Sequence, residues 1–239
     1  PWQLQKLIRK IVNKRFEYLV LEATSNGLAQ FRLLGCNFYI GAVTNITQDH
    51  LDYHGTWKSY AQAKAMLLEN AKIAVLDRDD KKSYEFLKKI LPKEKIITYG
   101  LKQGQVNLKT FPFKTTLLGK YNQLNCLAAI AVTQALGINR EDIQKGVFGF
   151  KGVIGRMEVM LQHPFKVIVD FAHTPNALEQ VLTTLKKSLL KNSRLIALFG
   201  CAGDRDKQRR RMGEVAAKLA NITVITAEDP RLEGVESIS

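Results

Sequence analysis

Residues 38–64, FYIGAVTNITQDHLDYHGTWKSYAQAK, join a short apolar run to a polar loop and then to a helical pattern. The apolar run at residues 38–43 predicts a buried strand, and the loop after it begins with Thr44 and Asn45 and contains His50. In open parallel sheets, ligands bind at the carboxyl ends of the strands. The stretch therefore predicts an α/β fold with its binding site just after residue 43.

A helix should begin after Gly55 and Thr56, because apolar and aromatic residues then recur at helical spacing. Lys64 shares the inward face of this helix with Trp57, Tyr60, Ala61, Leu67 and Leu68. A desolvated lysine tends to lose its proton, and a neutral amine can react with carbon dioxide to form a carbamate. The carbamate would make Lys64 a carboxylate-like metal ligand.

Two plainer interpretations of the same residues stay open. His50 and His54 lie four positions apart, so they could form a zinc pair or be ordinary loop histidines. A lysine in an amphipathic helix usually extends its ammonium group to water along the surface. Neither interpretation needs a carbamate.

The composition is that of a soluble globular protein, with 46% hydrophobic and 24% charged residues in 239. No apolar run approaches the roughly 20 residues that span a membrane, and we expect no signal peptide. Cys36, Cys126 and Cys201 are too widely spaced for a disulfide framework or a metal site, which favours a reducing, cytoplasmic location. The net charge of +14 fits nucleic acid or polyanionic small substrates such as nucleotides.

The remaining patterns predict alternating helices and strands in two domains. A glycine-punctuated hinge at residues 152–155 places the boundary between residues 1–154 and 155–239. Helices are predicted at residues 2–14, 81–90, 140–150 and 176–190, and an alanine-rich helix follows residue 125. Strands are predicted at residues 16–22, 72–77, 95–98, 166–170, 194–199 and 222–227, and in pieces around 111–113.

Residues 44–64 resemble the signature of the Mur ligases, in particular of their UDP-N-acetylmuramoyl-tripeptide synthetase (MurE) branch. The resemblance implies that His50 binds magnesium and that Lys64 is carbamylated. Residues 22–32, EATSNGLAQFR, are similar to the family's E-V-S-S-H-G-L-x-Q-x-R, which implies that Glu22 is another magnesium ligand. By the same resemblance, the UDP-sugar dipeptide would be bound by Thr24, Ser25, Gln30 and Arg32. The plain alternative is that Glu22 caps a helix beginning near Ser25.

Further motifs resemble the family's ATP-binding elements. Residues 119–125, GKYNQLN, imply that Asn125 and Asn122 hold adenine, although both could simply form a helix N-terminus. Residues 155–158, GRME, imply that Arg156 reaches the nucleotide phosphates. Residues 170–176, DFAHTPN, imply that Asp170 bonds the ATP ribose and that His173 lines the same cleft or caps the turn.

Two motifs near the C-terminus concern the incoming amino acid. Residues 200–206, GCAGDRD, resemble the family's G-C-G-G-D-R-D loop and imply that Arg205 binds a carboxylate of this substrate. Residues 228–231, EDPR, occupy the place of the selector D-N-P-R, which assigns Glu228, Asp229 and Arg231 to substrate binding. Arg231 favours the distal carboxylate of meso-diaminopimelate, whereas the anion at Asp229 could favour the distal ammonium of L-lysine.

The resemblance implies the mostly parallel sheet of a Mur-ligase central ATPase domain, followed by the start of a Rossmann-like C-terminal domain. The implied activity is an ATP-dependent amide ligase of peptidoglycan precursor synthesis. It would use ATP and Mg²⁺ to add a diamino acid, with meso-diaminopimelate favoured over L-lysine, to UDP-N-acetylmuramoyl-L-alanyl-D-glutamate. Glu22, His50 and Lys64 would act in catalysis. We expect a cytoplasmic monomer that binds neither nucleic acid nor membrane.

Three rivals stay open. A folylpolyglutamate-synthetase-like ligase would share fold and mechanism, and a basic nucleic-acid-binding module would use the positive charge. The third is an inactive, ligase-derived fragment, because the sequence contains no G-x-x-x-x-G-K-[ST] loop to bind the ATP phosphates. The chain starts at Pro1 without a methionine, so we interpret it as an internal piece of a longer polypeptide whose isolated form is inactive.

Overall fold

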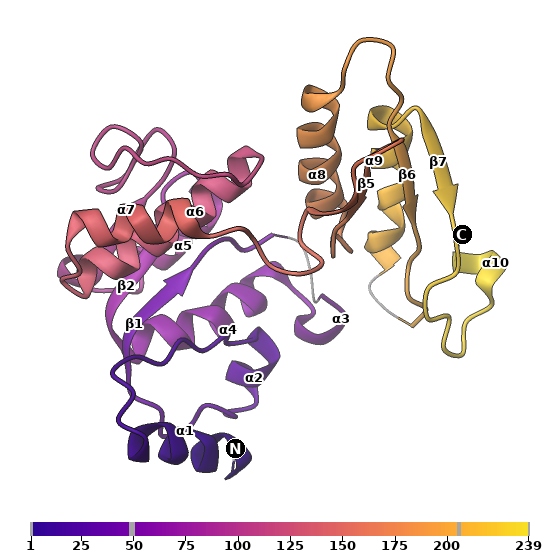
Figure 1. Cartoon of the computed structure of the whole chain (residues 1–239). Coiled ribbons are helices and arrows are strands. Elements are labelled where there is room, and N and C mark those ends of the chain that lie inside the picture. Colours follow the sequence, from indigo (N-terminus) through magenta and orange to yellow (C-terminus); the bar gives the residue numbers. More distant parts are fainter. Residues whose placement is uncertain (1, 48–50, 205–206, 239) are drawn as a thin grey trace. The chain divides into compact units, whose positions relative to one another are not determined.

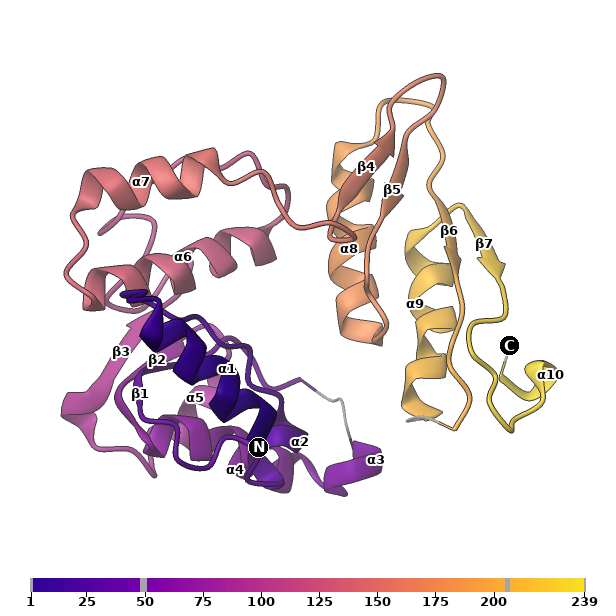
Figure 2. The same ribbon diagram turned by 60° about the horizontal axis from the view of Figure 1, so that its bottom comes forward.

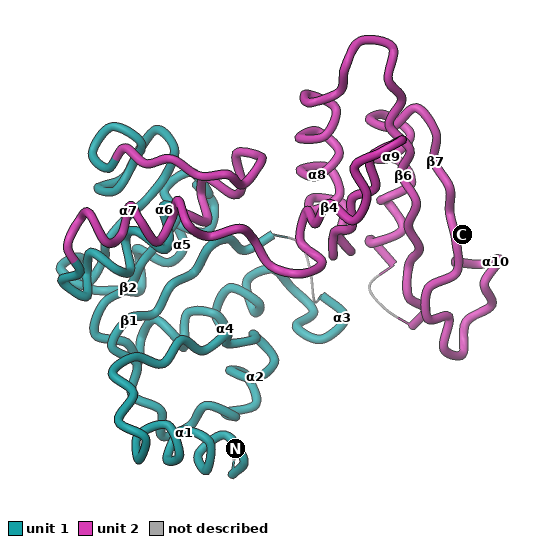
Figure 3. The backbone as a smooth tube through the Cα atoms, viewed as in Figure 1, with its two compact units in different colours: residues 1–111, 127–138 teal, residues 112–126, 139–239 magenta. Residues whose placement is uncertain are grey.

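The computed structural model describes residues 2–47, 51–204 and 207–238 (Figure 1). The chain forms two compact units, coloured separately in Figure 3. Unit 1 contains residues 1–111 and 127–138, and unit 2 contains residues 112–126 and 139–239. Helix α6 (Lys120–Ala135) contributes residues to both units. The domain boundary after residue 154 stays a prediction.

Unit 1 is built on a parallel sheet in the order β1 (Phe38–Val43), β2 (Ala71–Asp77) and β3 (Ile96–Tyr99). Helix α4 (Trp57–Glu69) connects β1 to β2, and α5 (Lys81–Leu87) with the 3₁₀ turn Lys93–Lys95 connects β2 to β3. These elements confirm the strand at 38–43 and the helix after Thr56. The remaining helices of this unit are α1 (Trp2–Asn13), α2 (Ser25–Ala29) and α3 (Leu51–His54).

The core of unit 1 explains why α4 lies where it does. Its face with Tyr60, Ala61 and Leu68 is buried against β1 and β2, as the helical spacing predicts. Thr56 caps the helix by accepting a hydrogen bond from the backbone N–H of Ser59 at 3.1 Å. At Gly41 of β1, an added Cβ would lie 3.2 Å from the Leu68 side chain, so glycine permits this close packing.

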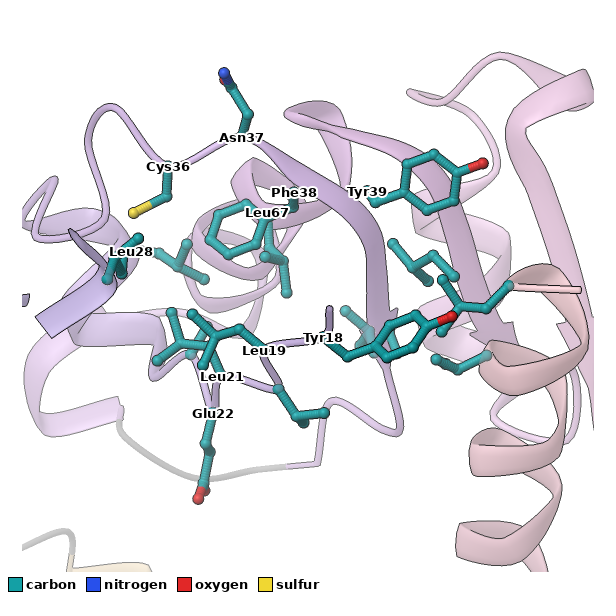
Figure 4. A pocket seen from close by; sticks show the side chains of 18 of the residues that line it. Tyr18, Leu19, Leu21, Glu22, Leu28, Cys36, Asn37, Phe38, Tyr39 and Leu67 are labelled. Carbon is teal, nitrogen blue, oxygen red and sulfur yellow. The ribbon is translucent and has the colours of Figure 1, made fainter. Parts of the chain in front are cut away.

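The prediction of a strand at residues 16–22 is wrong. Residues 18–22 line one side of a cavity. The residues of β1, apart from Gly41, line the other side. Figure 4 shows Tyr18, Leu19 and Leu21 on one side of this cavity and Phe38 and Tyr39 on the other. Apolar alternation predicts extended backbone, but a strand also needs a partner within hydrogen-bonding distance. In the part of the chain that the structure describes, β1 pairs only with β2.

The strands predicted around residues 111–113 are also absent from the described structure. One isolated bridge joins Tyr99 to Val106, and turns follow it. The Asn107 side chain accepts hydrogen bonds from the backbone N–H groups of Lys109 and Thr110, at 2.8 and 3.1 Å. Such local side-chain bonds compete with strand pairing, which explains the error.

Unit 2 contains an antiparallel pair, β4 (Glu158–Leu161) with β5 (Val167–Val169), and a parallel pair, β6 (Ile196–Phe199) with β7 (Ile222–Ile225). Helices α8 (Pro175–Ser188) and α9 (Met212–Leu219) lie side by side in Figures 1 and 2. Leu178, Leu182, Ala197, Met212 and Ala216 form their shared core with β6. The unit also contains α7 (Arg140–Gly149), the 3₁₀ turn Lys207–Arg211 and α10 (Val235–Ile238).

The predicted α/β class is therefore confirmed, with parallel pairing in both units and, among the described strands, one antiparallel pair. Among the described residues, no helix has the length and hydropathy needed to cross a membrane.

Asp77 is a buried carboxyl group at the carboxyl end of β2. It accepts a hydrogen bond from the backbone N–H of Asp79 at 2.8 Å. Burial, reinforced by the charges of Asp79 and Asp80, raises the pKa of Asp77 to about 6. The folded state therefore binds this proton more tightly than the unfolded state, whose pKa is close to 3.8.

We expect the free energy of unfolding to fall as pH rises from about 4 to above 6, because ionised Asp77 is penalised only in the folded state. Asp77→Asn removes this charge and keeps an acceptor for the Asp79 amide. The variant should gain about 1–2 kcal/mol over the parent protein at pH 8 and little at pH 4. Urea unfolding of both proteins at the two pH values measures this. An equal difference at pH 4 and pH 8 would contradict the assignment.

Candidate functional site

Two predicted site residues, Glu22 and Lys64, line one cavity of about 790 Å³ in unit 1, and Thr44 lines it with them. Glu22 comes from the extended segment before α2, Thr44 follows β1, and Lys64 lies on α4. Figure 4 shows Glu22 at the end of the segment that forms one wall. The structure thus brings Glu22 and Lys64 to the same cavity at the carboxyl end of β1, where ligands of parallel sheets bind. His50, the third predicted ligand, lies outside the described residues.

Lys64 is half-buried, in keeping with its place on the inward face of α4. Its Nζ donates to the backbone oxygen of Asn45 at 3.4 Å and lies 5.1 Å from the centre of the Tyr60 ring. As an ammonium group, Lys64 repels a cation. As a carbamate, it would present oxygen atoms to the cavity that Glu22 and Thr44 also line, and oxygen atoms are the ligands that magnesium prefers.

Within the described ranges, no three His, Cys, Asp or Glu side chains form a cluster that could hold a metal ion.

The predicted substrate residues around α2 fall into two groups. Thr24 and Arg32 line a second cavity of about 450 Å³ together with Glu22. Ser25 and Gln30 instead contact α3. The Nε2 atom of His54 is 3.0 Å from Ser25 Oγ, and Gln30 Nε2 donates to Tyr53 Oη at 3.0 Å.

Thr24, rather than Glu22, caps α2, because its hydroxyl accepts from the backbone N–H of Gly27 at 3.1 Å. The alternative in which Glu22 caps this helix is therefore wrong.

The loop after β1 is held by side chains that we did not predict from the sequence. The backbone N–H of Ile46 donates to Asp80 at 3.1 Å, and Trp57 Nε1 donates to the Ile46 oxygen at 2.8 Å. Tyr99 Oη donates to the Thr44 oxygen at 3.4 Å. Trp57 and Tyr99 resemble ordinary core residues in the sequence, so no local pattern marks this role.

In unit 2, Asp170 is bonded to backbone groups next to two other predicted residues, Arg156 and His173. One carboxylate oxygen of Asp170 accepts from the backbone N–H of Met157, and the other accepts from that of Ala172, both at 2.8 Å. The Arg156 guanidinium lies over the Phe171 ring, 4.5 Å from its centre. His173 Nδ1 is 3.0 Å from the Phe171 oxygen, which agrees with a role in the turn.

Asn122 and Asn125 lie in the first turns of α6. Asn122 Nδ2 donates to the Leu118 oxygen at 2.7 Å, and Asn125 Nδ2 is 3.4 Å from Asn122 Oδ1. Between them in sequence, Tyr121 has its pKa raised to about 12 by burial and by the negative charge of Asp170. Its Oη is buried and has no hydrogen-bond partner in the described structure. The start of α6 and the Asp170 turn are thus close enough to interact electrostatically.

The loops after β6 and β7 interlock. The backbone N–H of Gly203 donates to the Asp229 oxygen at 2.9 Å, and that of Leu232 donates to Asp204 at 3.2 Å. Arg231 pairs with Asp229 at 3.6 Å.

The other predicted amino-acid ligands belong to the same region. Glu228 is exposed, and its charge adds to burial in raising the pKa of the Cys201 thiol. Arg205 lies outside the described residues.

Comparison with known proteins matches residues 1–133 to the Mur ligase middle domain and residues 155–239 to the Mur ligase glutamate ligase domain. The chain is 37% identical, over 98% of its length, to a UDP-N-acetylmuramoyl-L-alanyl-D-glutamate--2,6-diaminopimelate ligase from Synechocystis sp.. It covers 51% of that relative, so it spans about half the length of the curated relatives that it matches.

Two solved structures show how far the likeness extends. One of a UDP-N-acetylmuramoyl-L-alanyl-D-glutamate--2,6-diaminopimelate ligase has 35% identity and a TM-score of 0.67, covering 99% of this chain and 53% of that one. A Mycobacterium tuberculosis folylpolyglutamate synthase complexed with ADP and AMPPCP has a TM-score of 0.66 but only 21% identity, covering 84% of this chain and 51% of that one. The second likeness concerns the fold alone.

Gly203 provides a test of the interlocked loops. A Cβ at this position would lie 2.0 Å from the backbone oxygen of Pro230, so even alanine forces the two loops apart. We expect Gly203→Ala to destabilise unit 2 by about 2 kcal/mol or more, since buried backbone cannot shift cheaply. Gly213→Ala is the matched control, because a Cβ at that position in α9 meets nothing within 4 Å. Thermal unfolding compares them, and a Gly203→Ala protein as stable as the control would refute the contact.

Proposed function

The chain belongs to the Mur ligase family, and we propose that the protein containing it joins a diamino acid to UDP-N-acetylmuramoyl-L-alanyl-D-glutamate at the expense of ATP. The observation that carries the proposal is the cavity shared by Glu22, Thr44 and Lys64. The similarity to diaminopimelate ligases over nearly the whole chain supports it.

The reaction proceeds in two steps. The free carboxylate of the D-glutamate attacks the γ-phosphorus of ATP, so that an acyl phosphate forms and ADP leaves. The amine of the diamino acid then attacks the acyl carbon, the amide bond forms, and phosphate leaves with the bonding electron pair while the amine loses a proton. When bound, magnesium would neutralise the charge that develops on the transferring phosphoryl group.

Each group of predicted residues has a task in this proposal. Glu22, His50 and carbamylated Lys64 would hold the magnesium ion. Adenine would be bound by Asn125 and Asn122, the ribose by Asp170, and the phosphates by Arg156, whose ring contact with Phe171 orients the guanidinium. His173 would line the same site. The UDP-sugar dipeptide would bind at the residues around α2, which are Thr24, Ser25, Gln30 and Arg32.

For the diamino acid we propose meso-diaminopimelate. Its distal carboxylate suits a guanidinium, and Arg231 offers five N–H donors. The ion pair with Asp229 involves Nε of Arg231, at 3.6 Å. Arg205 would bind another carboxylate of the same substrate. Glu228 and Asp229 would face its ammonium groups. The named relatives are 2,6-diaminopimelate ligases, which supports this choice over L-lysine.

Lys64 provides the first test, in the protein made from the complete reading frame that contains this chain. We expect Lys64→Ala to lower turnover at least about 100-fold, because a metal ligand is lost. Short carboxylic acids should restore part of the activity by replacing the carbamate. Lys58→Ala removes an exposed lysine of the same helix and should leave activity unchanged. Formation of ADP that depends on the UDP-sugar dipeptide measures both, and a fully active Lys64→Ala protein would exclude the carbamate.

Arg231 provides the second test, because it separates the two diamino acids. We expect Arg231→Ala to raise KM for meso-diaminopimelate by about 100-fold, since the distal carboxylate loses its charge-assisted partner. The much weaker reaction with L-lysine, which lacks that carboxylate, should change little. Arg211→Ala, at an exposed arginine, is the control. Equal loss with both amino acids would assign Arg231 a structural role instead.

A further inference from the structure

Among the described residues helix α3 runs from Leu51 to His54, and two neighbouring side chains of this helix reach α2. His54 Nε2 is 3.0 Å from Ser25 Oγ, and Tyr53 Oη accepts from Gln30 Nε2 at 3.0 Å. Ser25 and Gln30 are both proposed to bind the UDP-sugar dipeptide. Two of the four residues that we propose to bind the dipeptide are therefore hydrogen-bonded to α3, which itself contains no proposed dipeptide ligand.

One face of the His54 ring packs against α4. The imidazole stacks on Tyr60, with ring centres 5.3 Å apart and planes 28° apart, and the Tyr53 ring meets it edge-on at 4.8 Å. Tyr60 is buried, and its ring centre lies 5.1 Å from Lys64 Nζ. His54 thus contacts both the Ser25 hydroxyl and the aromatic ring beside Lys64.

This packing fixes the direction of the imidazole. Stacked and edge-on aromatic contacts restrict how the ring can turn. The Ser25 hydroxyl has one hydrogen and two acceptor lone pairs, and it rotates to suit its neighbours. Because the Ser25 side chain is buried, with 4% of its surface exposed, its hydroxyl must be hydrogen-bonded. The tautomer of His54 therefore decides where the hydroxyl hydrogen of Ser25 points, because Ser25 accepts from Nε2–H but donates to an Nε2 without hydrogen.

We propose that His54 is a positioning residue whose Nε2–H donates to Ser25 Oγ. With a lone pair of Ser25 occupied in this way, the hydrogen of its hydroxyl stays available for an acceptor oxygen of the dipeptide, a carboxylate or carbonyl. His54 at the same time connects α2 to α4, the helix that carries Lys64. The proposal rests on the proposed function for the identity of the ligand, but the hydrogen bond itself can be tested without it.

The first experiment uses nuclear magnetic resonance and needs no activity. The chain has four histidines, so each imidazole can be assigned by a single His→Gln substitution. At pH 8, we expect the ¹⁵N spectrum of His54 to report hydrogen on Nε2, and Ser25→Ala to shift its Nε2 resonance. Ser59→Ala, at an exposed serine of α4, is the control that should leave His54 unchanged. Hydrogen on Nδ1, or no shift in Ser25→Ala, overturns the proposal.

The second experiment uses the complete protein and separates positioning from folding. His54→Phe keeps a ring on Tyr60 and loses the hydrogen bond. We expect it to raise KM for the UDP-sugar dipeptide by about 10-fold, with KM for ATP unchanged. Ser25→Ala should add little to this effect in the His54→Phe background, because the two residues act through one bond. Additive effects of the two substitutions, or an unchanged KM in His54→Phe, would contradict the proposal.

The two experiments fail in different ways. A parent protein without ligase activity would refute the proposed function and leave the resonance test of His54 standing. A protein that is an active ligase but has hydrogen on Nδ1 of His54 would refute only the positioning role.

Discussion

The backbone of residues 44–46 leaves the sheet, and side chains from three other elements hold it. Tyr99 on β3, Trp57 on α4 and Asp80 before α5 each bond a backbone group of this loop. Buried backbone N–H and C=O groups must find partners, so this arrangement fixes where the loop runs. Lys64 in turn donates to the Asn45 oxygen in the same loop. The loop that Lys64 contacts is therefore held in place by β3, α4 and Asp80.

Similar bonding fixes the candidate residues of unit 2. Both oxygens of Asp170 accept from backbone amides, and the Thr174 hydroxyl caps α8. The loops after β6 and β7 are joined through Gly203, where no side chain fits. In each unit, most of the proposed ligand-binding residues lie outside the strands. Hydrogen bonds from carboxylates, hydroxyls or backbone groups hold these segments in place. His54 extends this pattern, because it orients a hydroxyl instead of a backbone group.

Local patterns predict much of this fold, and the exceptions have physical causes. The strand at 38–43 and helix α4 follow from apolar spacing, and the structure contains both. Residues 16–22 have the pattern of a strand, but residues 18–22 face β1 across a cavity, because pairing depends on a distant partner. The contacts of His54 with Ser25 and of Asp80 with Ile46 join residues 29 and 34 positions apart. Spacing along the sequence does not encode such pairs, and the roles of the site residues came from resemblance to the Mur ligases.

We propose that Lys64 carries a carbamate in a magnesium site that it shares with Glu22. A ¹³C nuclear magnetic resonance spectrum of the protein, equilibrated with ¹³C-labelled bicarbonate and magnesium, tests directly whether the carbamate forms. We expect one carbamate signal that disappears in Lys64→Arg and persists in Lys58→Arg. A protein without such a signal at saturating bicarbonate, or a signal that survives in Lys64→Arg, would contradict it.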